Sequence, residues 1–143
     1  MSQGKKNKRD FWKDDLWKVT TPDTIKRVIQ QGGKTLVEAA EKLGKEFQVG
    51  GLTTNQIRNV YGMVKQMEMQ GFDLNRFILL KPKLAYAEAR AGVKGAFQFK
   101  EVMTCAIEEV VESDDSERHK EKFARFIDFF EAILAYHKAA DGR

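Results

Sequence analysis

Apolar side chains recur every three or four residues along most of this sequence, which is the spacing of one face of an α-helix. The strongest stripe lies in the C-terminal part and consists of Phe123, Phe126, Ile127, Phe130, Ile133, Leu134 and His137. Phe129 and Tyr136 widen this stripe beyond what a helix at the surface needs. We therefore expect this helix to be buried between several others or to be shared with a partner molecule.

Helix start and stop signals divide the chain into short segments. Residues 21–23 (Thr-Pro-Asp) combine a cap, a first-turn proline and a first-turn acid, and Gly32-Gly33 ends the helix that they begin. Thr53 and Gln56 have the spacing of a capping box, and Asp73 is placed to cap the next helix. No segment of useful length alternates with period two. The sequence therefore predicts an all-α fold, a compact bundle of five to six short helices.

The 143 residues fit one domain that is long enough to bury a core. Residues 1–18 hold six cations and three acids, so we expect a basic, partly disordered N-terminal arm there and a single helical domain over residues 19–141. Trp12 and Trp17 belong to an apolar cluster with helical spacing inside this arm. They suggest that the arm docks onto the fold or onto a neighbouring chain.

The segment around Pro82 places cations and an aromatic ring on a short helix. Pro82 suits the first helical position, and Lys81 before it is expected to lie outside the α region. Lys83, Tyr86 and Arg90 then fall on one helical face. Two cations beside a ring suit a phosphate backbone and an exposed base, whereas the alternative is a core tyrosine beside two solvated cations. The spacing does not choose between these interpretations.

Positive charge is concentrated in the middle of the chain. The formal net charge of the chain is +4, but residues 54–100 alone hold eight cations and three acids, a balance of +5. This region is the best candidate for contact with a polyanion. Within it, Arg58 and Lys65 share a helical face with Gly62, and Lys94 lies in a predicted glycine-containing loop. Gly62 between these two cations would allow another backbone to come close, and the alternative is that this helical face is simply solvated.

Signals for catalysis or cofactor binding are weak. Residues 33–35 resemble the end of a P-loop without its preceding strand, and residues 92–95 match the G-x-x-G loop of KH domains without strands for the KH sheet. His119 and His137 would lie about 27 Å apart along one helix, too far to share a metal. Cys105 has no histidine within a helical turn. We therefore expect no enzymatic activity, no cofactor and no metal site.

Cellular location is constrained by what the sequence contains. Cys105 is the single cysteine, which excludes an internal disulfide and fits a reducing cytosol. No apolar run approaches the ~18 residues that span a bilayer. The basic residues 5–9 are not followed by the apolar region of a signal peptide. We expect a cytoplasmic protein with no membrane partner.

Three blocks of sequence resemble a known family. They are Leu52–Arg58 (LTTNQIR), Leu80–Ala87 (LKPKLAYA) with Arg90, and Phe130–Lys138 (FEAILAYHK). In order and spacing, they resemble the small helical subunit of type III-A CRISPR effector complexes, the Csm family. The likeness extends over about residues 20–140, and the middle block is its most specific part.

The resemblance implies a non-enzymatic, all-helical protein that stacks in several copies beside other Csm subunits. It would line the groove that holds the duplex of guide RNA and target RNA, and would contact the target RNA through basic residues. Glu88 departs from the pattern, as an acid beside the basic face. The candidate RNA-binding residues are Arg58, Lys81, Lys83 and Arg90 from the matching blocks, with Lys65 and Lys94 added from the residues alone.

Two other functions stay open on the sequence alone. A helical adaptor would bind only protein through its aromatic C-terminal face, and would lose its partner when Phe126 or Phe130 becomes polar. An enzyme acting on nucleic acid would show turnover that depends on a divalent metal.

Overall fold

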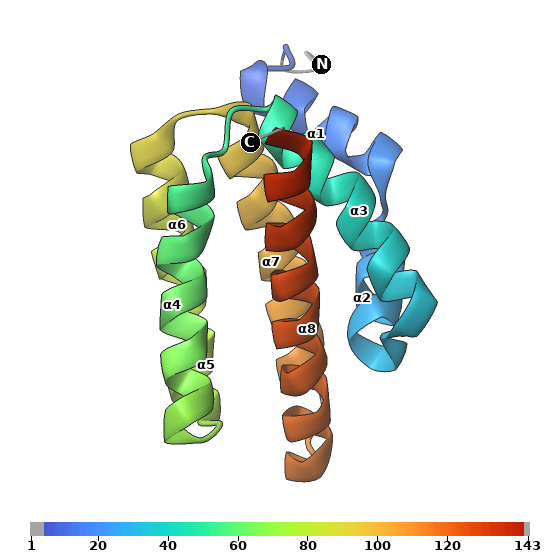
Figure 1. The fold of residues 1–143 in the computed structure, drawn as a ribbon, viewed down its shortest axis with the longest axis vertical. Helices are drawn as coiled ribbons and strands as arrows, with labels where there is room; N and C mark the ends of the chain where they lie inside the picture. The colour runs from blue at the N-terminus through green and yellow to red at the C-terminus, as the bar shows by residue number, and fades with distance from the viewer. Residues whose placement is uncertain (1–4, 142–143) are drawn as a thin grey trace.

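The computed structural model describes residues 5–141, and every regular element in this range is a helix (Figure 1). The helices are α1 (Lys8–Val19), α2 (Pro22–Gln31), α3 (Gly33–Val49), α4 (Thr54–Gln70), α5 (Leu74–Ile78), α6 (Leu80–Ala91), α7 (Lys94–Glu112) and α8 (Ser116–Asp141). The predicted all-α class is confirmed, and the described chain has more helices than the five to six expected. The extra helices include α1, which lies in the predicted arm, whereas α5, a five-residue helix just ahead of α6, begins after Asp73 as predicted.

Helix α8 occupies the middle of the bundle, with α4, α5 and α6 on one side, α2 and α3 on the other, and α7 behind (Figure 1). It packs most extensively against α3, and also against α2, α4 and α7. The rings of Phe126, Phe129 and Phe130 are at most 1% exposed. The wide apolar stripe is therefore buried between helices of the same chain. The adaptor alternative is wrong, because the aromatic face that it needs lies inside the core.

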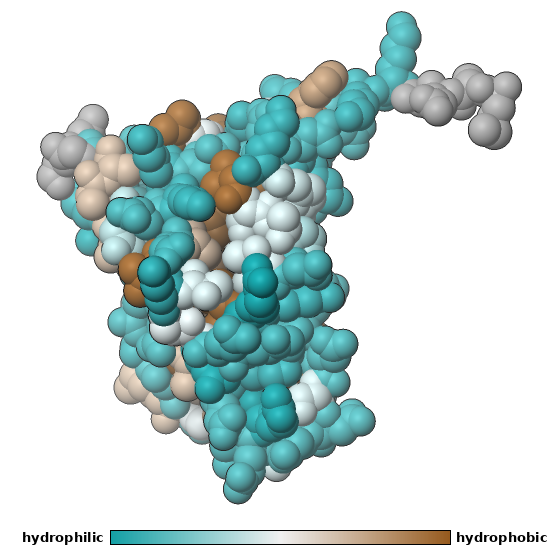
Figure 2. Space-filling model, turned by 90° about the vertical axis from the view of Figure 1, so that its right-hand side faces the viewer, coloured by the Kyte–Doolittle hydropathy of each residue, from teal (hydrophilic) through white to brown (hydrophobic). Residues whose placement is uncertain are grey.

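Aromatic rings from other helices meet α8 in this core. The Phe77 ring of α5 lies edge-on to Phe126, with 5.1 Å between the ring centroids. The Phe130 centroid lies 5.5 Å from that of Phe99 on α7 and 5.4 Å from that of Tyr61 on α4. Tilted and edge-to-face ring pairs add stabilisation beyond the area that they bury. Because the apolar stripes are buried in this core, the face over α2 and α3 is mostly hydrophilic (Figure 2).

Local capping begins the helices where the sequence predicts it. Thr21 accepts a backbone hydrogen bond at the start of α2, and Thr53 and Gln56 make both hydrogen bonds of the capping box at α4. The Asp73 side chain caps α5 in the same way. These caps satisfy N–H groups that have no acceptor within the first helical turn. They depend only on residues close in sequence, which is why the pattern predicts them.

The predicted start of α6 at Pro82 is wrong, because the helix begins at Leu80 and includes Lys81. Pro82 is the third residue of α6, where a backbone N–H would have no acceptor within the helix, so the missing N–H costs no hydrogen bond. Leu79 alone separates α5 from α6, with φ −69° and ψ −9° in the α region. The chain therefore continues from α5 into α6 with little interruption.

Most of the segment expected to be a partly disordered arm is helical. Leu16 is fully buried, and the Trp12 ring lies 5.8 Å from that of Phe97 on α7. Arg9 pairs with the buried carboxylate of Glu88 on α6. These contacts, made by residues far apart in sequence, hold α1 against α6 and α7. Residues 1–4 of the predicted arm lie outside the described residues.

Helices α3 and α8 cross closely at Gly44. A Cβ atom on Gly44 would lie 2.7 Å from the backbone nitrogen of His137 and 2.8 Å from the Cβ of Tyr136. We expect Gly44→Ala to lower the free energy of unfolding by about 1–3 kcal/mol, because the two helices must separate to admit the methyl group. Urea denaturation followed by far-UV circular dichroism measures this change.

Gly62 on α4 provides the matched control. Apart from the adjacent residues and the nearby backbone of α4 itself, no heavy atom of the described chain lies within 4 Å of a Cβ built there, so the close approach of another backbone considered for Gly62 is absent. Gly62→Ala should raise the free energy of unfolding by about 0.5–1 kcal/mol through its better helix propensity. If Gly44→Ala and Gly62→Ala changed the free energy of unfolding equally, the close crossing of α3 and α8 at Gly44 would be contradicted.

Candidate nucleic-acid interface

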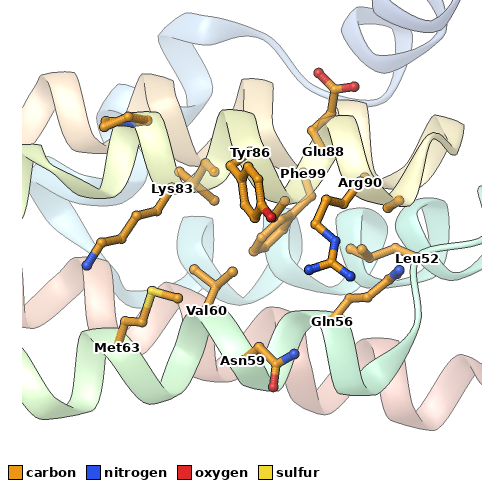
Figure 3. Close-up of a pocket in the computed structure, with 15 residues that line it drawn as sticks. Leu52, Gln56, Asn59, Val60, Met63, Lys83, Tyr86, Glu88, Arg90 and Phe99 are labelled. Atoms are coloured by element: carbon orange, nitrogen blue, oxygen red, sulfur yellow. The ribbon is translucent and has the colours of Figure 1, made fainter.

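A groove with a volume of about 820 Å³ runs between α4 and α6 (Figure 3). Lys83, Tyr86 and Arg90 line it from α6, so the prediction that these three share one face is confirmed. The Tyr86 ring projects into the groove and the residue is 65% exposed, which excludes the alternative of a core tyrosine. The groove therefore presents one exposed ring and two cations together.

Helix α4 forms the opposite wall of the groove (Figure 3). Gln56, Asn59 and Met63 lie along it at i, i+3 and i+7, and none of the three was predicted from the sequence as a site residue. Val60 and Phe99, at 3% and 4% exposure, make the adjoining surface apolar. The spacing on α4 is visible in the sequence. Only the packing of α4 beside α6 shows that this face meets Tyr86.

The two groove cations are not neutralised by the chain itself. Within residues 5–141, neither Lys83 nor Arg90 has a carboxylate oxygen within 4.0 Å. The Arg90 guanidinium instead lies 5.8 Å from the centroid of the Tyr86 ring, within the range of a cation–π interaction. Unpaired cations at the edge of a groove give it a positive potential that attracts anions.

Glu88, the acid beside the basic face, does not cancel this potential. Glu88 is part of the groove lining, but its side chain is only 7% exposed and its carboxylate is directed away from the α4 wall (Figure 3). It pairs with Arg9 of α1, and its carboxylate lies 3.8 Å from the ammonium of Lys100 on α7. Glu88 therefore has a structural role, since it joins α6 to both α1 and α7.

Residues 30–143, which include both walls of the groove, match the family model Csm2 Type III-A. The chain belongs to this family. It is thus a small subunit of type III-A Csm complexes, as its sequence blocks predicted, and it assembles with other Csm subunits. Helix α1 and most of α2 precede the matched range. Comparisons with curated proteins and with solved structures gave no match.

The other predicted RNA-binding lysines are already paired with acids. A hydrogen bond with Glu68 raises the pKa of Lys65, and a hydrogen bond from Lys94 lowers the pKa of Asp15. The three pairs are Lys65 with Glu68 at 2.5 Å, Lys81 with Glu108 at 3.1 Å and Lys94 with Asp15 at 2.7 Å. An RNA phosphate would have to compete with these carboxylates.

Arg58 is exposed and has no carboxylate partner within the described chain. It follows Gln56 by two residues, which is about 200° around α4, so it faces away from the groove. Of the six predicted RNA-binding residues, the structure thus brings together Lys83 and Arg90 at the groove. The remaining four lie outside its lining.

Residues considered for metal or nucleophilic chemistry belong to the packing. His137 is 1% exposed, with its Nε2 atom 2.5 Å from the carbonyl oxygen of Leu52, and His119 packs beside Phe72. Burial raises the pKa of the Cys105 thiol to about 11, so the thiol stays protonated near neutral pH. The part of the chain that the structure describes has no group of three or more His, Cys, Asp or Glu side chains able to hold a metal ion.

The KH interpretation of residues 92–95 is wrong, because residues 5–141 contain no strand from which a KH sheet could be built. Gly92 ends α6 with φ 66°, and α7 already begins at Lys94. Among the described helices, none has the length and apolar character that crossing a bilayer requires.

Proposed function

We propose that this Csm2-family subunit is a non-catalytic RNA-binding protein of the type III-A effector complex. It contacts the backbone of the target RNA, paired with guide RNA, without reading its sequence. Several copies stack along the complex in the cytoplasm. The observation that carries the proposal is the groove between α4 and α6, where two cations without acidic partners flank an exposed ring.

The spacing of the two cations suits a nucleic-acid backbone. Lys83 and Arg90 are seven residues apart on α6, which corresponds to about 10 Å along the helix axis. Each side chain can therefore contact a different phosphate of the same strand. Phosphate contacts position a protein on nucleic acid and carry no sequence information. Specificity then comes from base pairing with the guide.

The other predicted contacts have unequal support. Arg58 is an exposed cation on the far side of α4, and a phosphate contact there would be separate from the groove. Lys65, Lys81 and Lys94 would first have to leave their carboxylate partners. Exposed ion pairs contribute about 0–1 kcal/mol to stability, so exchanging the carboxylate for an RNA phosphate costs little free energy. Lys83 and Arg90 remain the primary contacts.

Replacing Lys83 and Arg90 together with alanine should weaken the binding of single-stranded RNAs of unrelated sequence alike. Each lost phosphate contact should also make the log–log dependence of affinity on salt shallower by about 0.7, or about 1.4 for the double variant. Fluorescence anisotropy with labelled RNA over a series of salt concentrations measures both effects.

The control is the variant with Arg118→Ala and Lys120→Ala, which removes the same charge from exposed positions of α8 outside the groove lining. It should change the salt dependence less than the groove variant does. An unchanged affinity and slope in the groove variant would remove the assignment of the site. Metal-dependent RNA turnover by the purified chain would contradict the non-catalytic part of the proposal.

A further inference from the structure

We propose that the groove between α4 and α6 holds one unstacked nucleobase of the RNA, with the Tyr86 ring as its stacking surface. This inference rests on the proposed function, because the same strand supplies the phosphates for Lys83 and Arg90. It goes further, because a backbone contact alone needs neither an aromatic ring nor an apolar cavity.

The first argument is the exposure of the ring. Tyr86 is 65% exposed at the groove, although large apolar side chains normally gain stability by burial. Its neighbour Arg90 lies 5.8 Å from the ring centroid, so a planar guanidinium and a planar ring are already adjacent. Aromatic rings and arginine planes are the groups on which unpaired bases stack in proteins that bind single strands.

The second argument is the shape and lining of the cavity. A volume of about 820 Å³ lies within the range of pockets that bind small molecules, so a base with its sugar has room between the two helices. Val60 and Phe99 give the cavity an apolar surface, and Met63 of α4 adds an adaptable side chain (Figure 3). Such a lining accepts the face of any base.

The third argument concerns hydrogen bonding. The side-chain oxygen of Gln56 already accepts the backbone N–H of Thr53 at 2.9 Å. Asn59 is exposed, and its carboxamide makes no hydrogen bond to other described residues. An amide can both donate and accept, so it can meet the polar edge of any base. One adaptable amide fits a site that tolerates every sequence.

Charge favours RNA over a protein helix as the occupant. A partner helix laid in the groove would cover Lys83 and Arg90 and remove two cations from water, at a cost in free energy unless acids met both. An RNA strand brings a phosphate for each cation and a base for the ring. The inference also implies that the subunit prefers single-stranded or locally unpaired RNA to a fully stacked duplex.

The test compares adenosine 5′-monophosphate with ribose 5-phosphate, which carries the same phosphate without the base. In an NMR titration of the full chain, adenosine monophosphate should shift the signals of the Asn59 side-chain amide. It should also bind at least about fivefold more tightly than ribose 5-phosphate. Tyr86→Ala should reduce the affinity for adenosine monophosphate about five- to tenfold, whereas Tyr86→Phe should retain it. Neither variant should change the affinity for ribose 5-phosphate.

The outcomes separate this inference from the proposed function. Equal binding of the two small molecules, or no Asn59 shift with either, would overturn the base site and leave the backbone contact standing. With longer RNA, Tyr86→Ala should lower the affinity without changing the salt slope, whereas the loss of Lys83 and Arg90 changes the slope. If the salt slope stayed the same in the variant that lacks Lys83 and Arg90, the proposed function would be overturned instead. Because Tyr86 is exposed, its variants should keep the wild-type unfolding curve.

Discussion

Phe130→Ala should lower the free energy of unfolding by about 3–5 kcal/mol, which is the usual cost of removing a fully buried phenylalanine ring. Phe130 is 0% exposed and its ring contacts those of Tyr61, Phe99 and Phe126. These rings come from α4, α7 and α8, so the cavity would open where three helices meet. The melting temperature should fall by roughly 10 °C or more.

Differential scanning calorimetry or urea denaturation measures this loss, and Phe11→Ala is the control. Phe11 on α1 is 55% exposed, so its removal should change the stability by less than about 0.5 kcal/mol. A stable Phe130→Ala protein that had lost only a protein partner would restore the adaptor function, which the burial of this ring now excludes.

Glu109→Ala should destabilise the fold by about 3–5 kcal/mol, because it leaves the buried ammonium of Lys122 without a counter-charge. The Lys122 Nζ atom donates to the Glu109 carboxylate at 2.7 Å and to the Glu109 carbonyl at 3.2 Å. The two side chains are only 8% and 3% exposed. Gln30 of α2 also donates to the same carboxylate, so the pair joins α2, α7 and α8.

A double variant separates the pair from the cavity that either substitution leaves. Glu109→Ala combined with Lys122→Met removes both charges, so it should recover much of the stability lost by Glu109→Ala alone. The exposed pair Lys34–Glu38, with 3.8 Å between its charged atoms, is the surface control, and Glu38→Ala should cost less than about 1 kcal/mol. If Glu109→Ala lowered the free energy of unfolding as little as Glu38→Ala does, the stabilising role of the buried pair would be contradicted.

The same pair predicts a dependence of stability on pH. Burial by itself raises the pKa of Glu109, but the hydrogen bonds from Lys122 and Gln30 and the charge of Lys122 outweigh it, so the pKa lies below its ordinary value of 4.5. The stabilisation is therefore complete above that ordinary pKa and is lost as the pH falls through the lower pKa of the folded state. Urea denaturation at a series of acidic pH values should show a smaller pH-dependent loss for Glu109→Gln than for wild type.

Much of the site was predictable because it depends on one helix. Lys83, Tyr86 and Arg90 share a face of α6 by spacing alone, and the structure places all three at one groove. Asn59 was not predictable as a site residue, because its role depends on α4 packing beside α6. The start of α6 was misplaced because a proline is tolerated anywhere in the first turn, so it does not mark one position.

The sequence by itself determined the helical class and the capped starts of α2, α4 and α5, because these depend on residues near one another along the chain. It also determined membership of the family, because that match compares the order of residues and needs no folded structure. Only the tertiary structure decided which cations stay unpaired. Lys81 meets Glu108, Lys94 meets Asp15 and Arg9 meets Glu88, and these partners lie between 27 and 79 residues away. Ion pairing depends on distance in space, and no sequence pattern reports it for helices that meet only when the chain folds.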